Sequence, residues 1–436
     1  MQKQWYRLDT AALIFPAVAK RDWCNAFRLS VTLNEPVDPE VLQKAVEKLA
    51  KRFPSFFVTL RKGFFWYYLE ESRHPVTVRE DYAYPLTFMR RRELQKNCLR
   101  VLYYKNRIAL EFFHALTDGR GGSVLLCNLT ACYLSLRYGL RLPVSGELVD
   151  LAEAPRAEEL EDSFLKYTAE AALGGSETRA YRLRGTREED GFRHLTTGIV
   201  DTGALVGLAR SYGVSVTALL GGVMARSVIA LQNQEVPRRR QRPVRITIPV
   251  DLRRLYGSRT LRNFALVLNT GVDPRFGDYS TEQLCKTIWH QLCACATPQY
   301  MAGMIAANVL PQRVAALRLA PVGVKNLVMK LVYLQRGEGG GCLNISNLGS
   351  MSLPEEMRTY VRRMEFIIGP QRSYPNNCSV VSYGGKTYIN MIRSIREKEL
   401  ERRFFSELVA MGIPVEIETN RRDRALHIGG ETQCTV

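Results

Sequence analysis

The chain has 436 residues, enough for one large domain or two of medium size, and its hydrophobic fraction of 46% is typical of a globular protein. It contains no recognisable signal peptide, no apolar run near the ~20 residues that span a bilayer, and no C-x-x-C pair among its ten cysteines, so a cytoplasmic protein without a transmembrane segment or metal site is expected. The formal charge of +18 favours an anionic partner, such as anionic lipid, a phosphorylated cofactor or an acidic carrier protein, whereas the lack of any helix-turn-helix, zinc-finger or RNA-binding signature argues against nucleic acid.

The first half of the chain predicts a strand, an amphipathic helix, two hairpins and a buried helix. Asp38 is a good helix N-cap and Pro39 suits the first turn, and an apolar stripe follows. The second hairpin turns at Lys105–Arg107, and a glycine-rich loop leads from it into the buried helix. In chain order these elements cover residues 27–33, 38–53, 56–69, 101–112 and 123–138, which indicates an α/β arrangement.

The most distinctive stretch is the loop before that buried helix. His114 and Asp118 stand four residues apart, and Gly119 follows at once. A neutral imidazole can take a proton from a hydroxyl or amine near pH 7 if its ring is held in one orientation, and a nearby carboxylate can help to hold it. The three glycines of the loop are expected to adopt backbone angles closed to other residues and to let a substrate approach the main chain. A surface hydrogen-bond pair is the alternative interpretation of this histidine and aspartate.

Residues 142–196 are interpreted as the connection between two halves, because they are rich in Glu, Arg, Ala and Gly. Residues 301–334 are the most apolar region, but prolines and charged residues interrupt them, so buried or groove-lining helices are expected there rather than membrane contact. Ser280 and Gln283 form a capping-box pattern at the start of one helix. In the second half, helices are expected at 201–211, 216–232, 281–296 and 398–411, and strands at 244–250, 265–270, 343–349, 378–383 and 387–392.

The pattern H-x-x-x-D-G resembles the active-site motif of the chloramphenicol acetyltransferase and peptide-synthetase condensation-domain superfamily. The opening Trp5–Pro16 and the C-terminal Gly412–Val415 segment are similar to bacterial alcohol acetyltransferase-like members of it. The resemblance implies an α/β (α+β) fold of two lobes, each a mixed sheet with flanking helices, with the active-site histidine in a channel between them. The expected division is 1–180 for the first lobe, 181–194 for a connection, 195–420 for the second lobe and 421–436 for a tail.

The resemblance also implies roles for individual residues. His114 would be the general base, and an arginine would pair with Asp118 and lock the loop that carries the histidine. Arg253 is the first choice for this arginine, with Arg259 and Arg262 as rivals, and a surface charge is the alternative reading.

Ser346 and Asn347 lie on a predicted second-lobe strand. Either could donate a hydrogen bond to the oxyanion that forms when the carbonyl group of a thioester is attacked. A structural role for Asn347, capping the turn before Gly349, is the alternative. The plant-type D-F-G-W-G segment is absent, which leaves the contacts to the acyl donor unassigned.

The resemblance implies an acyltransferase that moves an acyl group from a thioester, acyl-CoA or an acyl carrier protein, to a small-molecule alcohol. No tightly bound cofactor is expected. Two alternatives stay open: a free-standing condensation domain that joins an amine to a carrier-bound acyl group, and a degenerate binding module of the same fold. Serine-hydrolase chemistry is disfavoured because the chain lacks a G-x-S-x-G elbow.

Overall fold

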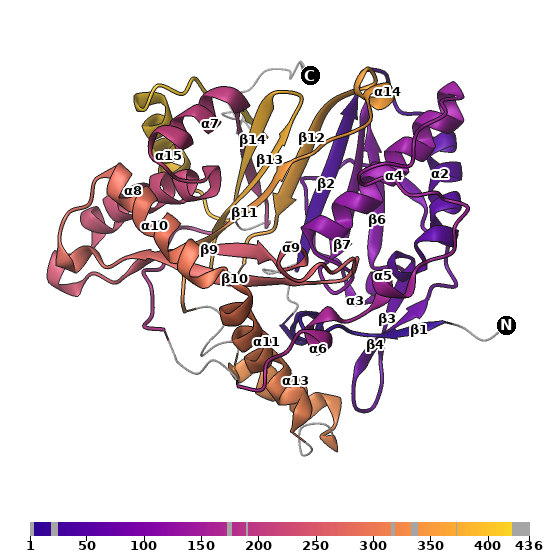
Figure 1. The fold of residues 1–436 in the computed structure, drawn as a ribbon, viewed down its shortest axis with the longest axis horizontal. Coiled ribbons are helices and arrows are strands. Elements are labelled where there is room, and N and C mark those ends of the chain that lie inside the picture. The colour runs from indigo at the N-terminus through magenta and orange to yellow at the C-terminus, as the bar shows by residue number, and fades with distance from the viewer. Residues whose placement is uncertain are drawn as a thin grey trace, which may run out of the picture.

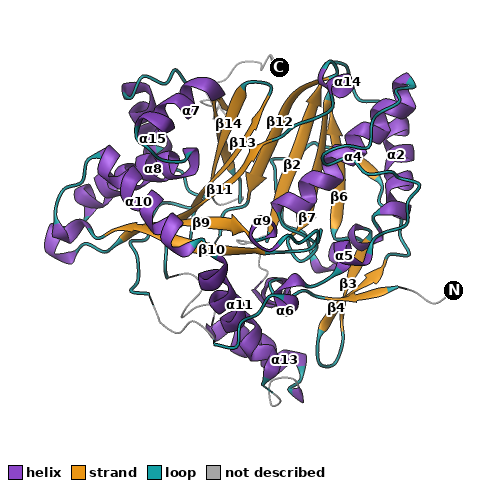
Figure 2. Ribbon diagram, viewed as in Figure 1, coloured by secondary structure: helices purple, strands orange, loops and turns teal. Residues whose placement is uncertain are grey.

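The computed structural model describes residues 4–18, 25–171, 177–188, 191–314, 319–332, 339–371 and 373–420. Within these ranges the chain forms two large mixed sheets, one small sheet and the helices that flank them (Figure 1, Figure 2). The predicted tail, residues 421–436, lies outside the described residues. The small sheet is antiparallel, in the order β1 (Trp5–Arg7), β4 (Tyr67–Glu71) and β3 (Val58–Lys62).

The first large sheet carries the His114 loop at the end of one of its central strands. Only the edge pair β5–β6 is parallel, so the sheet is mixed, as expected. Two helices cover one face: α2 (Pro39–Arg52), which Asp38 caps as predicted, and α4 (Gly119–Tyr138), which Asp118 caps. The strand order is β12 (Val361–Ile368), β2 (Ala26–Leu33), β7 (Arg107–Phe113), β6 (Leu99–Tyr104) and β5 (Val78–Glu80).

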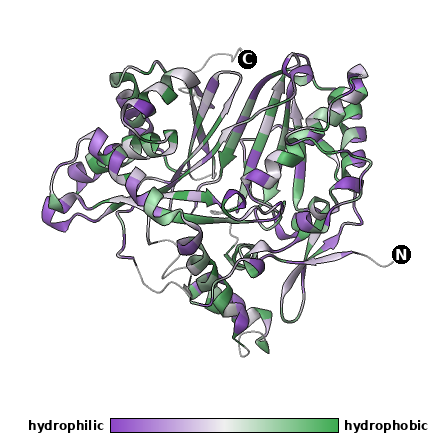
Figure 3. Ribbon diagram, viewed as in Figure 1, coloured by the Kyte–Doolittle hydropathy of each residue, from purple (hydrophilic) through white to green (hydrophobic). Residues whose placement is uncertain are grey.

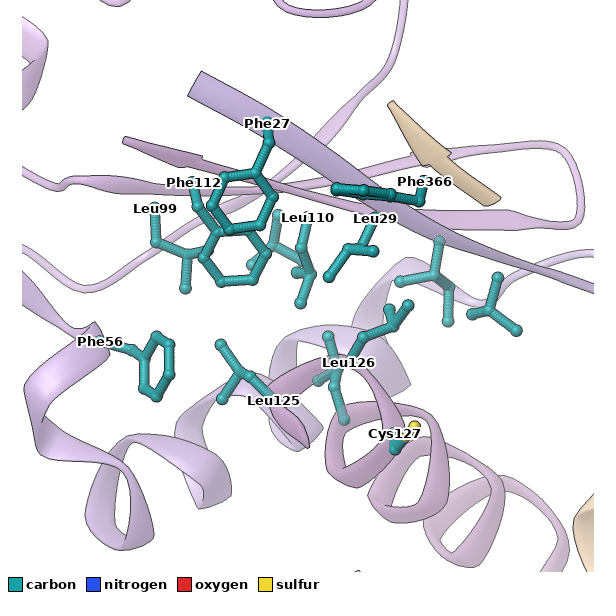
Figure 4. Close-up of a cluster of buried hydrophobic side chains, with 14 of the residues drawn as sticks. Phe27, Leu29, Phe56, Leu99, Leu110, Phe112, Leu125, Leu126, Cys127 and Phe366 are labelled. Atoms are coloured by element: carbon teal, nitrogen blue, oxygen red, sulfur yellow. The ribbon is translucent and has the colours of Figure 1, made fainter. Parts of the chain in front are cut away.

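Aromatic and aliphatic side chains fill the space between this sheet and α4 (Figure 4). Phe27 of β2 stacks on Phe112 of β7, with ring centroids 4.9 Å apart, and Phe366 of β12 lies edge-on to Phe27. Leu125 and Leu126 of α4 are each about 1% exposed and complete the layer. Because β7 and α4 both pack into this core, the loop between them is held at both ends.

The second large sheet has seven strands and is also mixed, with β9–β11 and β11–β13 parallel. Its main helices are α8 (Val216–Glu235), α10 (Thr281–Cys295), α15 (Glu399–Ala410) and α7 (Thr202–Ser211). The capping box predicted at the start of α10 is present. The strand order is β10 (Ala265–Val272), β9 (Val244–Asp251), β11 (Leu343–Ser350), β13 (Asn376–Tyr383), β14 (Lys386–Arg393), β8 (His194–Asp201) and β15 (Glu416–Thr419).

Helix α8 is long and apolar enough, by length and composition, to cross a membrane. However, 67% of its apolar window is buried inside the protein, where it packs against α10, α15 and β9. Its apolar character is that of a core helix in the second lobe.

The two sheets are interleaved, because β12 comes from the second half of the chain and pairs with β2 of the first half. Strand β12 is also bound to β13 and β14 of the second sheet by side-chain hydrogen bonds. The Phe366 carbonyl oxygen accepts hydrogen bonds from Ser379 Oγ at 2.7 Å and Asn390 Nδ2 at 3.0 Å, and both donors are fully buried. A division of the chain at residues 181–194 therefore does not completely separate the two sheets.

Candidate active site

A cavity of about 600 Å³ lies between the two lobes, and His114 is part of its wall. The first lobe contributes Phe15, the start of β2 and the start of α4, and the second lobe contributes the facing parts of β9, β10 and β11. All six residues singled out in the sequence line this one cavity: His114, Asp118, Gly119, Arg253, Ser346 and Asn347.

His114 follows the last residue of β7 and is held by its backbone and by two aromatic rings. Its N–H donates to the Asn25 carbonyl oxygen at 2.8 Å. The Phe15 ring stacks on the imidazole, with centroids 4.5 Å apart, and Phe27 lies edge-on at 5.2 Å. Burial lowers the pKa of His114 below its ordinary value, although Asp118 and other neighbours oppose the shift. The ring is therefore neutral at pH 7 and able to accept a proton.

Asp118 accepts four hydrogen bonds, which lock the His114 loop against the second lobe. Two come from the Arg253 guanidinium, at 2.9 and 3.0 Å, and two from the N–H groups of Phe264, at 2.8 Å, and Gly121, at 3.1 Å. Burial alone would raise the pKa of Asp118, but Arg253 and the two N–H groups hold it below its ordinary value. The carboxylate is therefore ionised, and its four hydrogen bonds hold the loop in position.

The predicted pairing of Asp118 with Arg253 is confirmed. The rival Arg262 lies against Asp9 instead, with 3.6 Å between its Nε and the carboxylate, and Arg259 is exposed.

No family model and no curated protein matches the sequence, but solved structures match the fold over nearly the whole chain. TRI101 of Fusarium sporotrichioides, complexed with coenzyme A and T-2, has a TM-score of 0.62 at 11% identity, covering 94% of this chain and 99% of that one. TRI3 trichothecene 15-O-acetyltransferase of the same organism has a TM-score of 0.60 at 11% identity, with coverages of 93% and 94%. The epimerization domain from the third module of tyrocidine synthetase B has a TM-score of 0.58 at 12% identity, with coverages of 94% and 96%.

The protein therefore shares the fold of these solved acetyltransferase and epimerization-domain structures. The two mixed sheets and the cavity between them are the two-lobed architecture that the H-x-x-x-D-G resemblance implied.

Asn263, from the second lobe, fixes the tautomer of His114. Its Nδ2 donates to the His114 carbonyl oxygen at 3.0 Å and to Asp9 Oδ2 at 3.1 Å, so its Oδ1 is the atom that faces the imidazole. This Oδ1 lies 3.1 Å from His114 Nδ1 and can only accept a hydrogen bond. Nδ1 therefore carries the proton, and Nε2 keeps the lone pair that a general base needs.

Asp9 is the buried anchor behind Asn263. Its Oδ2 also accepts from the Asn263 N–H at 3.3 Å, and its Oδ1 accepts from the Ala12 N–H at 2.7 Å. Burial raises the pKa of Asp9 to about 6, against the opposing effect of Arg262. At neutral pH the ionised carboxylate orients the Asn263 amide.

The sequence analysis named Arg262, the neighbour of Asn263, only as a possible partner of Asp118, and it did not reveal that Asn263 reaches His114. The two residues are 149 positions apart, and neither hydrophobic periodicity nor motif spacing records such a contact.

The glycines after Asp118 are explained by crowding rather than by backbone angle, which corrects the expectation from the sequence. None of them has a positive φ, because all three lie within α4. A Cβ on Gly121 would lie 2.1 Å from Thr117 Oγ1 and 2.2 Å from the Leu261 carbonyl oxygen, so the second lobe itself occupies the space. On Gly119, which lines the cavity, a Cβ would meet the flexible end of Leu348 at 2.7 Å.

Ser346 and Asn347 of β11 both line the cavity that also contains His114, but their surroundings differ. Asn347 Oδ1 accepts from the Gly349 N–H at 2.8 Å, and its Nδ2 donates to Thr217 Oγ1 at 3.1 Å. Asn347 thus shapes the turn before Gly349, which is the structural alternative named from the sequence. Ser346 presents a hydroxyl, and Thr217 adds a second one to the same wall.

Proposed function

We propose that the protein is an acyltransferase that moves an acyl group from acyl-CoA to an alcohol, with His114 as the general base. The observation that carries this proposal is the neutral His114 with Nδ1 engaged by Asn263, in the cavity between the lobes. Because Nδ1 is engaged by Asn263 of the second lobe, the imidazole can accept a proton from a hydroxyl only through Nε2.

The reaction needs one proton transfer in each direction. His114 Nε2 removes the proton of the acceptor hydroxyl as its oxygen attacks the thioester carbonyl carbon. The carbonyl oxygen becomes an oxyanion, which the Ser346 hydroxyl stabilises, since the Asn347 amide is already engaged. The intermediate then collapses, the C–S bond breaks, and the imidazolium returns the proton to the thiolate.

Three features support a coenzyme A donor. The TRI101 structure is complexed with coenzyme A, and the formal charge of this chain is +18. Arg254 and Arg120 line the same cavity, where a guanidinium can hold a phosphate. The proposal of an alcohol acceptor draws on the O-acetyltransferase name of TRI3 and on the resemblance of the terminal segments to alcohol acetyltransferase-like proteins.

The test is thiol release from a panel of acyl-CoAs, with and without candidate alcohols. We expect release that depends on the alcohol, a loss of ~10²–10⁴-fold in turnover for His114→Ala, and no loss for the matched control His290→Ala on the exposed face of α10. Intact-protein mass spectrometry with acyl-CoA alone should show no acyl-enzyme. A His114 adduct, an undiminished alanine variant, or turnover only with amines and carrier-bound thioesters would contradict the proposal.

A further inference from the structure

Helix α13 (Val322–Val332) has two faces of different character. One face packs on the protein through Val322, Lys325 and Asn326, whose Nδ2 donates to the Tyr67 hydroxyl at 3.0 Å. The other face is apolar and exposed, at the i, i+3, i+4 and i+7 positions of one helix stripe. These side chains are 51%, 59%, 36% and 51% exposed: Val324, Leu327, Val328 and Leu331. Buried or groove-lining helices were expected at 301–334, but in the described part of this region the stripe on α13 faces outward.

The tip of the β3–β4 hairpin extends the same apolar surface. Phe64 is 70% exposed and Phe65 is 41% exposed. The hairpin is fastened to α13, because the Val322 N–H donates to the Phe64 carbonyl oxygen at 2.8 Å and Lys325 Nζ donates to the Phe65 carbonyl oxygen at 2.9 Å. Figure 1 shows the hairpin and α13 at the same end of the molecule, and Figure 3 shows hydrophobic positions along that end. We call the six exposed side chains the apolar surface: Phe64, Phe65, Val324, Leu327, Val328 and Leu331.

The charge along the segment that contains α13 has one sign. No Asp or Glu occurs between Glu282 and Glu338 in the sequence. Exposed bases stand on either side of the surface: Lys62 on the hairpin, Lys330 on α13 and Arg313 at the end of α11 (Pro298–Arg313). An apolar stripe flanked by exposed Lys and Arg, without acidic residues, has the composition of a helix that lies in a membrane interface.

We propose that the apolar surface docks the protein onto an anionic phospholipid bilayer. Phe64, Phe65 and the four residues of α13 enter the boundary between headgroups and acyl chains, while Lys62 and Lys330 bind the lipid phosphates. Trp66 lies beside the tip, with Lys325 Nζ 3.3 Å from its ring centroid, and tryptophan favours this depth of a bilayer. Docking does not depend on the acyl transfer proposed above, and it is measured without any substrate.

The first experiment is sedimentation with vesicles of phosphatidylcholine, with and without phosphatidylglycerol. We expect binding of the full chain to the anionic vesicles and weaker binding as salt rises. Phe64→Ser combined with Leu327→Ser should weaken binding by at least about tenfold, because each side chain loses apolar burial. Lys62→Glu combined with Lys330→Glu should weaken it by at least ~5-fold for each charge lost. The matched control is Phe276→Ser combined with Val409→Ser, two exposed side chains elsewhere, and it should bind as the wild type does.

A second measurement reads the depth of the wild-type protein in the bilayer, so it does not depend on whether the serine or glutamate variants fold. Brominated lipids should quench part of the wild-type tryptophan fluorescence, and the Trp66→Phe variant, compared with Trp5→Phe as its control, should lose that quenching. Failure of the wild type to bind anionic vesicles, or equal binding by the serine variant and its control, would overturn the proposal. So would self-association of the wild type that the serine variant abolishes, since the surface would then contact a second copy.

Discussion

Replacing Asp118 with asparagine tests whether this carboxylate holds the His114 loop against the second lobe. The substitution keeps the shape of the side chain but removes its charge and turns one of its two acceptor oxygens into a donor. That donor would then face the Arg253 guanidinium or the N–H of Phe264 or Gly121. The variant therefore cannot satisfy all four donors that now point at the carboxylate.

The expected cost can be worked from the contacts. Breaking a buried ion pair by removing one partner costs about 3–5 kcal/mol. The side chains of Asp118 and Arg253 are 9% and 10% exposed, so the pair is buried, but Asp251 Oδ1 also accepts from Arg253 at 2.9 Å and keeps part of its charge compensated. We therefore expect a loss near the lower limit, about 3 kcal/mol, together with a lower kcat because the His114 loop shifts.

Urea denaturation followed by circular dichroism measures the loss, with Asp38→Asn as the matched control. Asp38 also caps a helix, but its side chain is 41% exposed and asparagine makes the same two capping bonds, so the control should change little. A double-mutant cycle with Arg253→Met should give a coupling above ~1 kcal/mol. The pKa of Asp118 is lowered in the folded state, so its stabilisation is full above pH 3.8 and is lost as pH falls further. An Asp118→Asn variant as stable as the control, or additive effects in the cycle, would refute the reasoning.

Three further predictions concern the same site. The pKa of His114 is lowered, so the acid limb of the kcat/KM profile should have its midpoint below 6.5, and a midpoint above this value would contradict the neutral base at the site. Asn263→Ala should reduce kcat by at least about tenfold with little change in KM, because the imidazole loses its fixed tautomer; a change in KM alone would point to a binding role. Gly121→Ala should prevent stable folding, because the Leu261 carbonyl oxygen cannot move away, whereas Gly119→Ala should fold and lose activity through a narrower cavity. Expression yield and thermal unfolding distinguish the two glycine variants, and equal tolerance of both would be evidence against the crowding argument.

Much of the local structure could be predicted because its causes are local. The Asp38 cap, the Ser280–Gln283 capping box and the hairpin that precedes His114 each depend on residues a few positions apart. Asp118 and Arg253 are 135 residues apart. Their pairing was predicted only through resemblance to a superfamily, because the hydrophobic periodicity of the sequence does not indicate such a contact.

The features that could not be predicted from the sequence are those that depend on contacts between the two lobes. Strand β12 was not predicted as part of the first sheet, because its partner β2 is more than 300 residues away. The Gly412–Val415 segment, which was singled out by resemblance, precedes the last described strand, Glu416–Thr419, because Pro414 lacks a backbone N–H for the sheet. The role of Asn263 and the crowding at Gly121 also depend on the approach of the second lobe.

The position of β12 has a consequence for how the protein is made. All eight residues of β2 are buried in the finished molecule, and its outer edge pairs only with β12. A nascent chain on the ribosome reaches Val361 long after β2, β7 and α4 have been released. During that interval β2 has an open, apolar edge to which another chain can add a strand. The first lobe therefore cannot complete its sheet during translation until nearly the whole chain has been synthesised, and a C-terminal truncation before β12 would leave an aggregating fragment rather than a small domain.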